Sequence, residues 1–425
     1  MSQEVQLTST SFSRRSLLKA AGVGLGVFAF APLLTGCAGG SGAGGSKTVT
    51  FWHYTVSSDK VATGTNKAMA ALFEKAKPGY TMNLVYIPAE QMTNKLIGTA
   101  TNKQGPDTIM HSGDLDQLVP AKVLSDLSDK FKAWDQKDKF PESALGKRNG
   151  KIYSIKSYAN LIGLWYNKDI LDECGVTDLP TTFDELGTAL KKVGSKYIGL
   201  GIAGAGDNTN ADWQGRPFYS GFGFDYLKPK VGPLEETFTL LNDWRKAGYL
   251  PNDVATWTQV SSFPRFTAGQ VAFCVNGNWQ LGNAKADAKF KFGVVPMPRG
   301  PKGGTVYMGG EEFSVGAFSE DPDLAWESLA DSWWSKEGSL LTLTRGGSIP
   351  LRTDLADAKE LQDPIIKQFQ LATKYGTAYP DAGLGTNVVA ARQAMGTGWN
   401  AMMSGQQTPA AAAQSVVDAL HKLGF

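Results

Sequence analysis

Apolar residues recur along the chain with two alternating periods. Short runs with the two-residue period of a strand are followed by longer stretches with the period of about 3.6 residues of a helix. The first kind predicts strands over residues 47–53, 80–87, 107–110, 152–155, 161–166, 197–204, 270–276, 290–298 and 311–318. The second kind predicts helices over residues 60–77, 91–102, 182–193, 235–246, 261–268, 278–288, 322–336, 363–374, 387–404 and 409–422. Such alternation is typical of an α/β protein with a largely parallel sheet, because parallel strands need crossover connections.

The most apolar stretch, residues 20–34, lies near the N-terminus. It has 15 residues, four of them glycine or proline, whereas a membrane-spanning helix needs about 20 apolar residues. Arg14 and Arg15 precede it and small residues follow it, which is the order of an export signal. We therefore expect residues 1–36 to be a signal peptide.

The motifs of this segment indicate its type. Residues 13–19, SRRSLLK, resemble a twin-arginine export motif, and an ordinary secretory signal is the alternative. Residues 34–37, LTGC, resemble a lipobox, in which the cysteine receives a diacylglycerol and becomes the first mature residue. Residues 37–46 are then the lipidated cysteine and a flexible Gly/Ser tether. We expect an exported protein anchored through Cys37 to the outer face of the cytoplasmic membrane.

Composition restricts the partners. The formal net charge of the 425 residues is +2, and removing residues 1–36 takes away three basic residues and one acidic residue, which leaves zero. The chain thus has no electrostatic signature of nucleic-acid binding. The remaining length suggests two lobes. Cys174 and Cys274 have no metal-binding spacing, and we interpret them as small apolar residues, although export would also permit a disulfide.

Motifs for cofactors and metals are weak. Residues 199–204 fit the glycine pattern of a dinucleotide-binding loop, but a polar stretch follows where a helix should begin directly. His53, His111 and His421 lie far apart in the sequence and lack the helical spacing of zinc ligands. We expect no cofactor and no metal.

Glu311 and Glu312 are adjacent carboxylates, a pair that could suggest glycoside hydrolysis. Neighbours on a strand point to opposite faces, so these two cannot flank one glycosidic bond. A distant carboxylate such as Asp114 could still form a catalytic pair with one of them, so a glycosidase stays open as an alternative.

Five stretches in order resemble one family. They are GLWYNKDILDECGVTDLPTTFDEL (163–186), FTAGQVAFCVNGNWQL (266–281), PDTIMHSGDLDQLVPAKVLSDLSD (106–129), GGSIPLR (346–352) and SGQQTPAAAAQSVVDAL (404–420). The chain from Lys47 onward resembles the extracellular solute-binding proteins of ABC-type carbohydrate importers, the maltose-binding-like group.

The resemblance implies an α/β, two-lobe fold of the periplasmic-binding-protein type II, with the ligand in a cleft between lobes joined by crossing strands. The first lobe would comprise residues 47–157 and 299–347, and the second residues 158–298 and 348–425. Such a protein captures a mono- or oligosaccharide and delivers it to the membrane permease. We expect a monomer without enzymatic activity.

The resemblance also implies binding residues in the first lobe. Asp114 occupies the position of a sugar-contacting acid, and His111 stands where relatives present an aromatic ring. Asn160 stands where some relatives have a carboxylate. His53 and Tyr54 end the first predicted strand, facing the expected cleft.

Trp213 and Tyr219 belong to a polar and aromatic segment that could line the second lobe. Glu311 and Arg392 would face the same region. Trp279 is the strongest candidate, because ligands of open α/β sheets bind beyond the carboxyl ends of strands. Asn278 would cap the helix that begins there, so that Trp279 lies in its first turn and offers an indole face to a sugar.

Two other functions stay open. The same fold could bind a non-sugar solute, such as glycerol phosphate, a polyamine or ferric iron. A surface glycosidase is the second alternative. Neither arginines, clustered carboxylates nor paired tyrosines are concentrated in the sequence.

Overall fold

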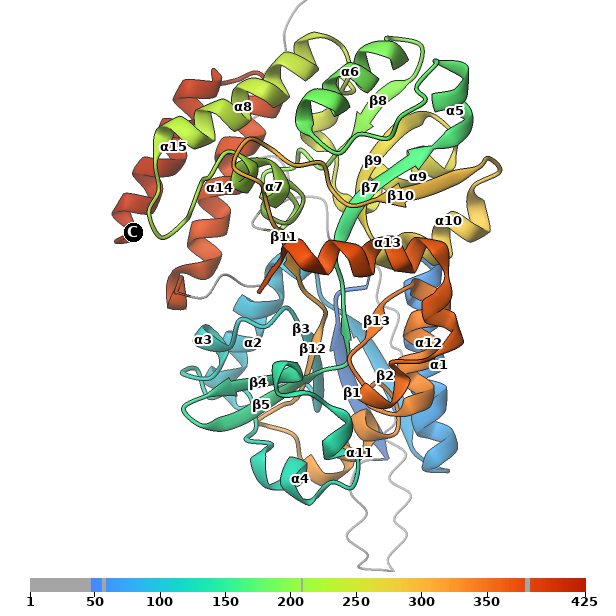
Figure 1. The fold of residues 1–425 in the computed structure, drawn as a ribbon. Helices are drawn as coiled ribbons and strands as arrows, with labels where there is room; N and C mark the ends of the chain where they lie inside the picture. The colour runs from blue at the N-terminus through green and yellow to red at the C-terminus, as the bar shows by residue number, and fades with distance from the viewer. Residues whose placement is uncertain (1–46, 56–58, 208, 379–382) are drawn as a thin grey trace, which may run out of the picture. The chain divides into compact units, whose positions relative to one another are not determined.

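The structure is a computed structural model that describes residues 47–55, 59–207, 209–378 and 383–425 (Figure 1). The expected signal peptide, Cys37 and the tether lie outside the described residues.

The first sheet has six strands in the order β2-β1-β3-β12-β5-β4. The bounds of these strands are β1 Thr48–His53, β2 Thr81–Tyr86, β3 Thr108–His111, β4 Leu145–Arg148, β5 Lys151–Lys156 and β12 Glu312–Val315. Strand β1 pairs in parallel with β2 and β3. The pairs β3–β12, β12–β5 and β5–β4 are antiparallel.

The second sheet has four strands in the order β10-β7-β9-β8. The bounds are β7 Ile162–Asn167, β8 Ile198–Gly201, β9 Val271–Gly277 and β10 Phe292–Val295. Strands β8 and β9 are parallel, and β7 is antiparallel to both β9 and β10. The prediction of largely parallel sheets is therefore wrong for both, because hairpins and returning strands join the parallel units.

Two short sheets complete the strands. Strand β11, Val306–Met308, pairs with β14, Gly376–Ala378, and β13, Ile349–Pro350, pairs with β6, Tyr158–Ala159. These pairs join segments that are distant in the sequence.

The α-helices fall into two groups, one near each of the two larger sheets (Figure 1). Those near the first sheet are α1 Lys60–Ala76, α2 Ala89–Asn102, α3 Leu115–Leu118, α4 Ser128–Ala133, α11 Pro322–Ala330 and α12 Lys336–Gly346. The others are α5 Lys168–Glu173, α6 Phe183–Val193, α7 Asn210–Gly221, α8 Val231–Lys246, α9 Gln259–Thr267, α10 Leu281–Asp287, α13 Pro364–Ala372, α14 Val388–Met403 and α15 Pro409–Lys422. Helix α15 packs against both α8 and α14. Across the described residues, no helix combines the length and apolar character needed to cross a bilayer.

Local capping explains where several helices begin and end. The Thr182 hydroxyl accepts a hydrogen bond from the Glu185 amide, and the Glu185 carboxylate accepts one from the Thr182 amide, each at 3.2 Å. This capping box starts α6. The predicted helix over 322–336 is wrong in its second half. It ends at Ala330, and Ser335 caps a separate helix, α12, by accepting a hydrogen bond from the Gly338 amide at 2.9 Å.

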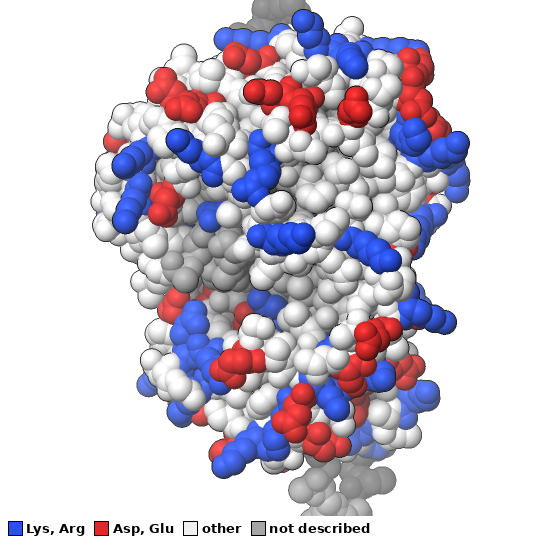
Figure 2. Space-filling model, in the orientation of Figure 1, with Lys and Arg blue, Asp and Glu red and all other residues white. Residues whose placement is uncertain are grey.

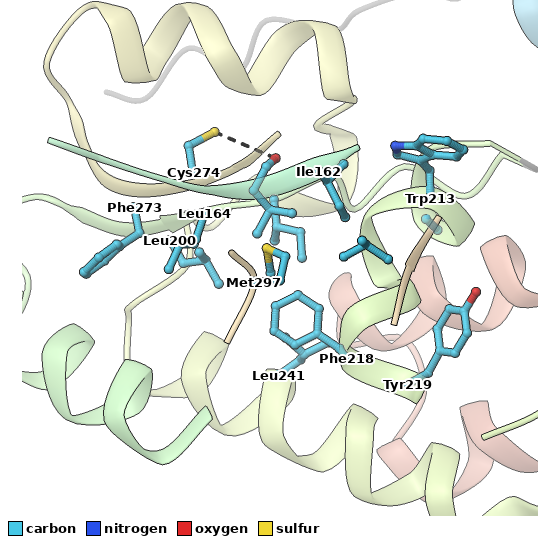
Figure 3. Packing of buried hydrophobic residues seen from close by; sticks show 14 of the residues in the cluster. Ile162, Leu164, Leu200, Trp213, Phe218, Tyr219, Leu241, Phe273, Cys274 and Met297 are labelled. Atoms are coloured by element: carbon cyan, nitrogen blue, oxygen red, sulfur yellow. Dashed lines mark hydrogen bonds between the residues drawn. The ribbon is translucent and has the colours of Figure 1, made fainter. Parts of the chain in front are cut away.

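Buried apolar side chains of the described residues form three clusters, and the second sheet lies in the largest of them, which is called the larger cluster below. Figure 3 shows Ile162, Leu164 and Leu200 of the sheet facing Phe218 of α7 and Leu241 of α8. Phe218 is fully buried, so it packs in the core.

The two cysteines are not joined by a disulfide. Cys274 is fully buried in the larger cluster, where burial raises the pKa of its thiol to about 12. Cys174 is half-buried against the same cluster. Both behave as small apolar residues.

Charge is dispersed on the face drawn in Figure 2. Lys and Arg side chains are interspersed there with Asp and Glu side chains. This pattern agrees with the near-zero net charge expected for the chain without residues 1–36.

Gly310 lies where the chain crosses toward β12, and its backbone requires glycine. Its φ is +122°, and a Cβ there would lie 1.9 Å from the carbonyl oxygen of Tyr158. We predict that Gly310→Ala destabilises the protein by at least about 2 kcal/mol in chemical denaturation, because it adds a backbone clash to an unfavourable φ. Gly248→Ala is the control, since its φ is +78° but nothing lies within 4 Å of the Cβ position. Its expected cost is about 1 kcal/mol. Equal costs for the two variants would contradict the role of the clash.

Candidate functional site

A cavity of about 560 Å³ lies between the two sheets. Its lining comes from the carboxyl ends of β1, β2, β3 and β9 and from the first turns of α1, α2, α7 and α9. The carboxyl ends of strands are where open α/β folds bind ligands, because helix N-termini and loops converge there. The volume is within the range of small-molecule sites.

Two indole rings form an aromatic wall. The rings of Trp213 and Trp279 have centroids 6.3 Å apart at 56°, and Trp213 also stacks on Tyr307 at 5.5 Å. Gly277 leaves the room for this arrangement, since a Cβ there would lie 1.9 Å from the Trp279 ring. Trp279 is half-buried, so part of its surface faces the cavity.

Glu311 lies in a polar group at the crossing segments. Its carboxylate accepts a hydrogen bond from the Asn160 side chain at 3.2 Å and also accepts from the hydroxyls of Tyr158 and Tyr54. Burial raises the pKa of Glu311, and the hydroxyls of Tyr158 and Tyr54 partly oppose that effect. Burial, and then the Glu311 carboxylate, raise the pKa of Tyr158 well above its usual value.

Asn278 joins the crossing segments below the aromatic wall. Its side chain accepts a hydrogen bond from the Leu161 amide at 2.8 Å and donates to the Gly347 carbonyl at 2.8 Å and to the Asn160 side chain at 3.2 Å. The prediction that Asn278 caps a helix is therefore wrong, because its oxygen is bonded to Leu161. Trp279 lies in a short 3-10 turn, Asn278–Gln280, that precedes α10.

The structure brings together half of the sequence-predicted binding residues. Tyr54, Asn160, Trp213, Trp279 and Glu311 all line the cavity. Asn160 has its amide engaged on both sides, by Asn278 and by Glu311, so it positions neighbours more than it presents free groups.

His53, His111 and Tyr219 do not line the cavity. His53 accepts a hydrogen bond from the Thr55 amide at 3.2 Å, and burial lowers the pKa of its ring. His111 is buried between Ser314, at 2.7 Å, and the Gly113 amide, at 3.1 Å, and burial lowers the pKa of this ring as well. These hydrogen bonds hold both imidazole rings to protein groups outside the cavity lining.

Tyr219 is fully buried, and its hydroxyl donates to the Asp212 carboxylate at 2.9 Å. The hydroxyls of Tyr226 and Tyr307 contact the same carboxylate oxygen, at 2.6 and 3.3 Å. Tyr219 therefore belongs to an internal network beneath the cavity wall.

Asp114 and Arg392, the remaining two candidates, also lie outside the lining. Their side chains are 3% and 5% exposed and form a salt bridge at 3.1 Å. Thr93 donates to the other oxygen of Asp114 at 2.6 Å. The pair connects the end of β3 to α14, and so bridges the two halves of the fold.

Sequence reasoning missed several lining residues, among them Tyr158, Asp59, Asn66 and Asp207. Asp59 caps α1 by accepting from the Ala62 amide at 2.9 Å, a signal that the sequence before a predicted helix carries. Tyr158 lies on a two-residue strand that has no periodicity to detect.

Comparison with known proteins identifies the class. Residues 68–368 match the family of bacterial extracellular solute-binding proteins, and since this is more than half of the chain, the protein belongs to that family. An arabinooligosaccharide-binding protein of Bacillus subtilis is 24% identical over 360 residues, which cover 78% of this chain and 80% of the relative. The melibiose/raffinose/stachyose-binding protein MelE of Bacillus subtilis is 24% identical over 315 residues, 69% of this chain and 71% of the relative.

Among solved structures, the GacH receptor of Streptomyces glaucescens superposes with a TM-score of 0.77 at 24% identity, over 89% of this chain and 98% of the other. The family and this likeness confirm the two-lobe α/β fold class predicted from the sequence.

The buried pair Asp114–Arg392 leads to a stability prediction. Asp114→Asn should destabilise the protein by about 3–5 kcal/mol in chemical denaturation, because the buried guanidinium loses this carboxylate. The double variant Asp114→Leu/Arg392→Met should lose less than Asp114→Asn, because it leaves no buried charge at this position.

The control is Asp172→Asn, which breaks an exposed pair with Lys168 one helical turn away. It should cost no more than about 0.5 kcal/mol. A cost for Asp114→Asn as small as that of the control would contradict a structural role for the buried pair.

Proposed function

We propose that this protein is the substrate-capture component of an ABC sugar importer. It holds a mono- or oligosaccharide in the cavity between its lobes and delivers it to permease subunits in the membrane. The observation that carries the proposal is the pair of indole rings, Trp213 and Trp279, beside the hydrogen-bonding group of Glu311.

The chemistry of a sugar matches these groups. One face of the sugar ring is a patch of C–H bonds, which suits an indole surface, and the hydroxyls at its edge suit carboxylates and amides. Hydrogen bonds to a charged group contribute about 1.5–3 kcal/mol each. Micromolar binding needs about −8.2 kcal/mol in total. One stacked ring and three or four such bonds therefore suffice after the cost of ordering. Two relatives of Bacillus subtilis are named for binding melibiose, raffinose and stachyose and for binding arabinooligosaccharides, which supports a saccharide as the ligand.

Capture requires the two lobes to close on the ligand, and closure needs a ligand that binds the closed form more tightly. We propose the predicted lobes with one change. The pairing of β11 with β14, together with the burial of Val306 and Tyr307 in the larger cluster, supports assigning residues 299–308 to the second lobe. The chain then returns to the first lobe at Gly309 and Gly310.

We also propose that the mature chain begins at Cys37 and is anchored there by lipid, as the sequence motif indicates. Mass spectrometry of the protein from its native membrane should give the mass of residues 37–425 plus a lipid modification. A water-soluble, unlipidated product from cells with intact lipoprotein processing would contradict this.

A thermal-shift screen against a sugar panel tests the function. At a hundredfold excess over its dissociation constant, the correct saccharide should stabilise the folded protein by about 2.7 kcal/mol. A shift with glycerol phosphate or a polyamine, and with no sugar, would overturn the carbohydrate assignment. Catalytic release of products from oligosaccharides would instead support a glycosidase.

Trp279→Ala tests the aromatic wall. The variant should weaken saccharide binding by about 2 kcal/mol or more in calorimetry, as the loss of an aromatic anchor commonly does. Its unfolding free energy without ligand should fall by less than the roughly 3–5 kcal/mol typical of a core tryptophan. Trp134→Ala is a matched control, because Trp134 is also half-buried but packs on Trp326 and Trp334, outside the cavity lining. It should leave affinity unchanged, and normal binding by Trp279→Ala would exclude stacking.

A further inference from the structure

The charged groups that line the cavity are all acidic among the described residues. Asp59, Glu90, Asp207 and Glu311 contribute four carboxylates from four separate segments, and no Lys or Arg of the described chain is part of the lining. The described residues contain no group of three or more His, Cys, Asp or Glu placed to hold a metal ion. The carboxylates are thus spread around the cavity and do not form a cation cage.

Two of these carboxylates are fixed in position by backbone donors. Asp59 accepts from the Ala62 amide at 2.9 Å, and Asp207 accepts from the amides of Thr209 and Asn210 at 2.8 and 2.7 Å. Within the described residues none of the four makes an ion pair with Lys or Arg. Lys156 acts electrostatically on Glu311, but its ammonium group pairs at 3.8 Å with Glu312.

Asn66 supplies an independent sign of what the ligand must offer. This residue of α1 is 4% exposed, lines the cavity, and its Nδ2 donor has no hydrogen-bond partner in the described structure. Buried donors are nearly always paired with a protein group or with ordered water, so a ligand acceptor that reached this nitrogen would satisfy it. A bare polyamine has no acceptor, whereas a saccharide has several.

A cleft lined by charges of one sign concentrates its electric field on the ligand. A protonated amine placed there gains charge-assisted hydrogen bonds, which are about twice as strong as neutral ones. A carboxylate on the ligand would meet like charges without a compensating cation. An ammonium group beside Glu311 would favour its ionised form and so oppose the effect of burial, which raises the pKa of this carboxyl.

We propose that the cavity selects its saccharide by charge. It binds an amino sugar, with a protonated amine, more tightly than the same sugar with a hydroxyl, and it excludes the corresponding uronic acid. This inference rests on the proposed function.

Calorimetric titration of the full chain with three matched series tests it. The probes are mono- and disaccharides of glucose, glucosamine and glucuronic acid, at about pH 6, where an amine of ordinary pKa is protonated and exposed carboxylates are ionised. The amine series should bind at least about tenfold more tightly than the hydroxyl series, and the uronate series at least about tenfold more weakly. An equal or reversed order, or no binding of any series, overturns the inference.

Glu311→Gln adds a readout that simple misfolding would not give. It should reduce the ratio of amine to hydroxyl affinity several-fold, whereas Glu236→Gln, the same charge change at an exposed site on α8, should leave the ratio unchanged. A ratio that Glu311→Gln does not alter counts against the inference.

Titration with spermidine distinguishes a failure of the proposed function from a failure of the charge selection. Binding of spermidine with no sugar bound overturns the proposed function, whereas sugar binding without an amine preference overturns the charge selection alone.

Discussion

The geometry of the cavity depends on the hydrogen bonds of the buried Asn278 side chain. This side chain holds the crossing segment before β7 through Asn160 and Leu161, and the segment after α12 through Gly347. These two segments link the parts of the fold that carry the two sheets. An aliphatic side chain would leave several buried backbone groups without partners, and each such group is costly. The bonds of Asn278 therefore fix how the crossing segments lie relative to each other.

The residues proposed to contact the ligand lie next to the residues that hold the crossing segments together. Trp279 follows Asn278 directly, and Asn160 passes the hydrogen-bonding chain on to Glu311. A ligand that contacts Trp279 and Glu311 thus touches both ends of the network that holds the crossing segments. The ligand would therefore contact the same segments about which the lobes would close. A ligand that binds the closed form more tightly than the open form could then favour closure through these contacts alone.

Periodicity predicted most elements, because local spacing decides whether a segment is helical or extended. Helix α15 has the predicted bounds, and α6 begins at its predicted cap. The order of the strands in the first sheet could not be predicted, because β12 lies between β3 and β5 through pairings between residues 156 to 207 positions apart. No local signal encodes such pairings. For the site, the strand-end rule located Tyr54 and Trp279. Asp114 and Arg392 do not line the cavity because their side chains form a buried salt bridge with each other. A sequence alone cannot show such a pairing.

The acidic lining follows from the same architecture and explains why overall charge did not reveal it. The cavity lies at the carboxyl ends of strands, where helices begin, and acidic residues are favoured at helix N-termini by the macrodipole and by capping. Asp59 and Asp207 occupy such positions at the starts of α1 and α7. Helix N-termini are also the usual binding sites for phosphate, but here these carboxylates already accept from backbone amides at both helix starts. With the proposed charge selection, a cavity built in this way would favour neutral and cationic ligands over phosphate esters, although the formal charge of the chain as a whole is nearly balanced.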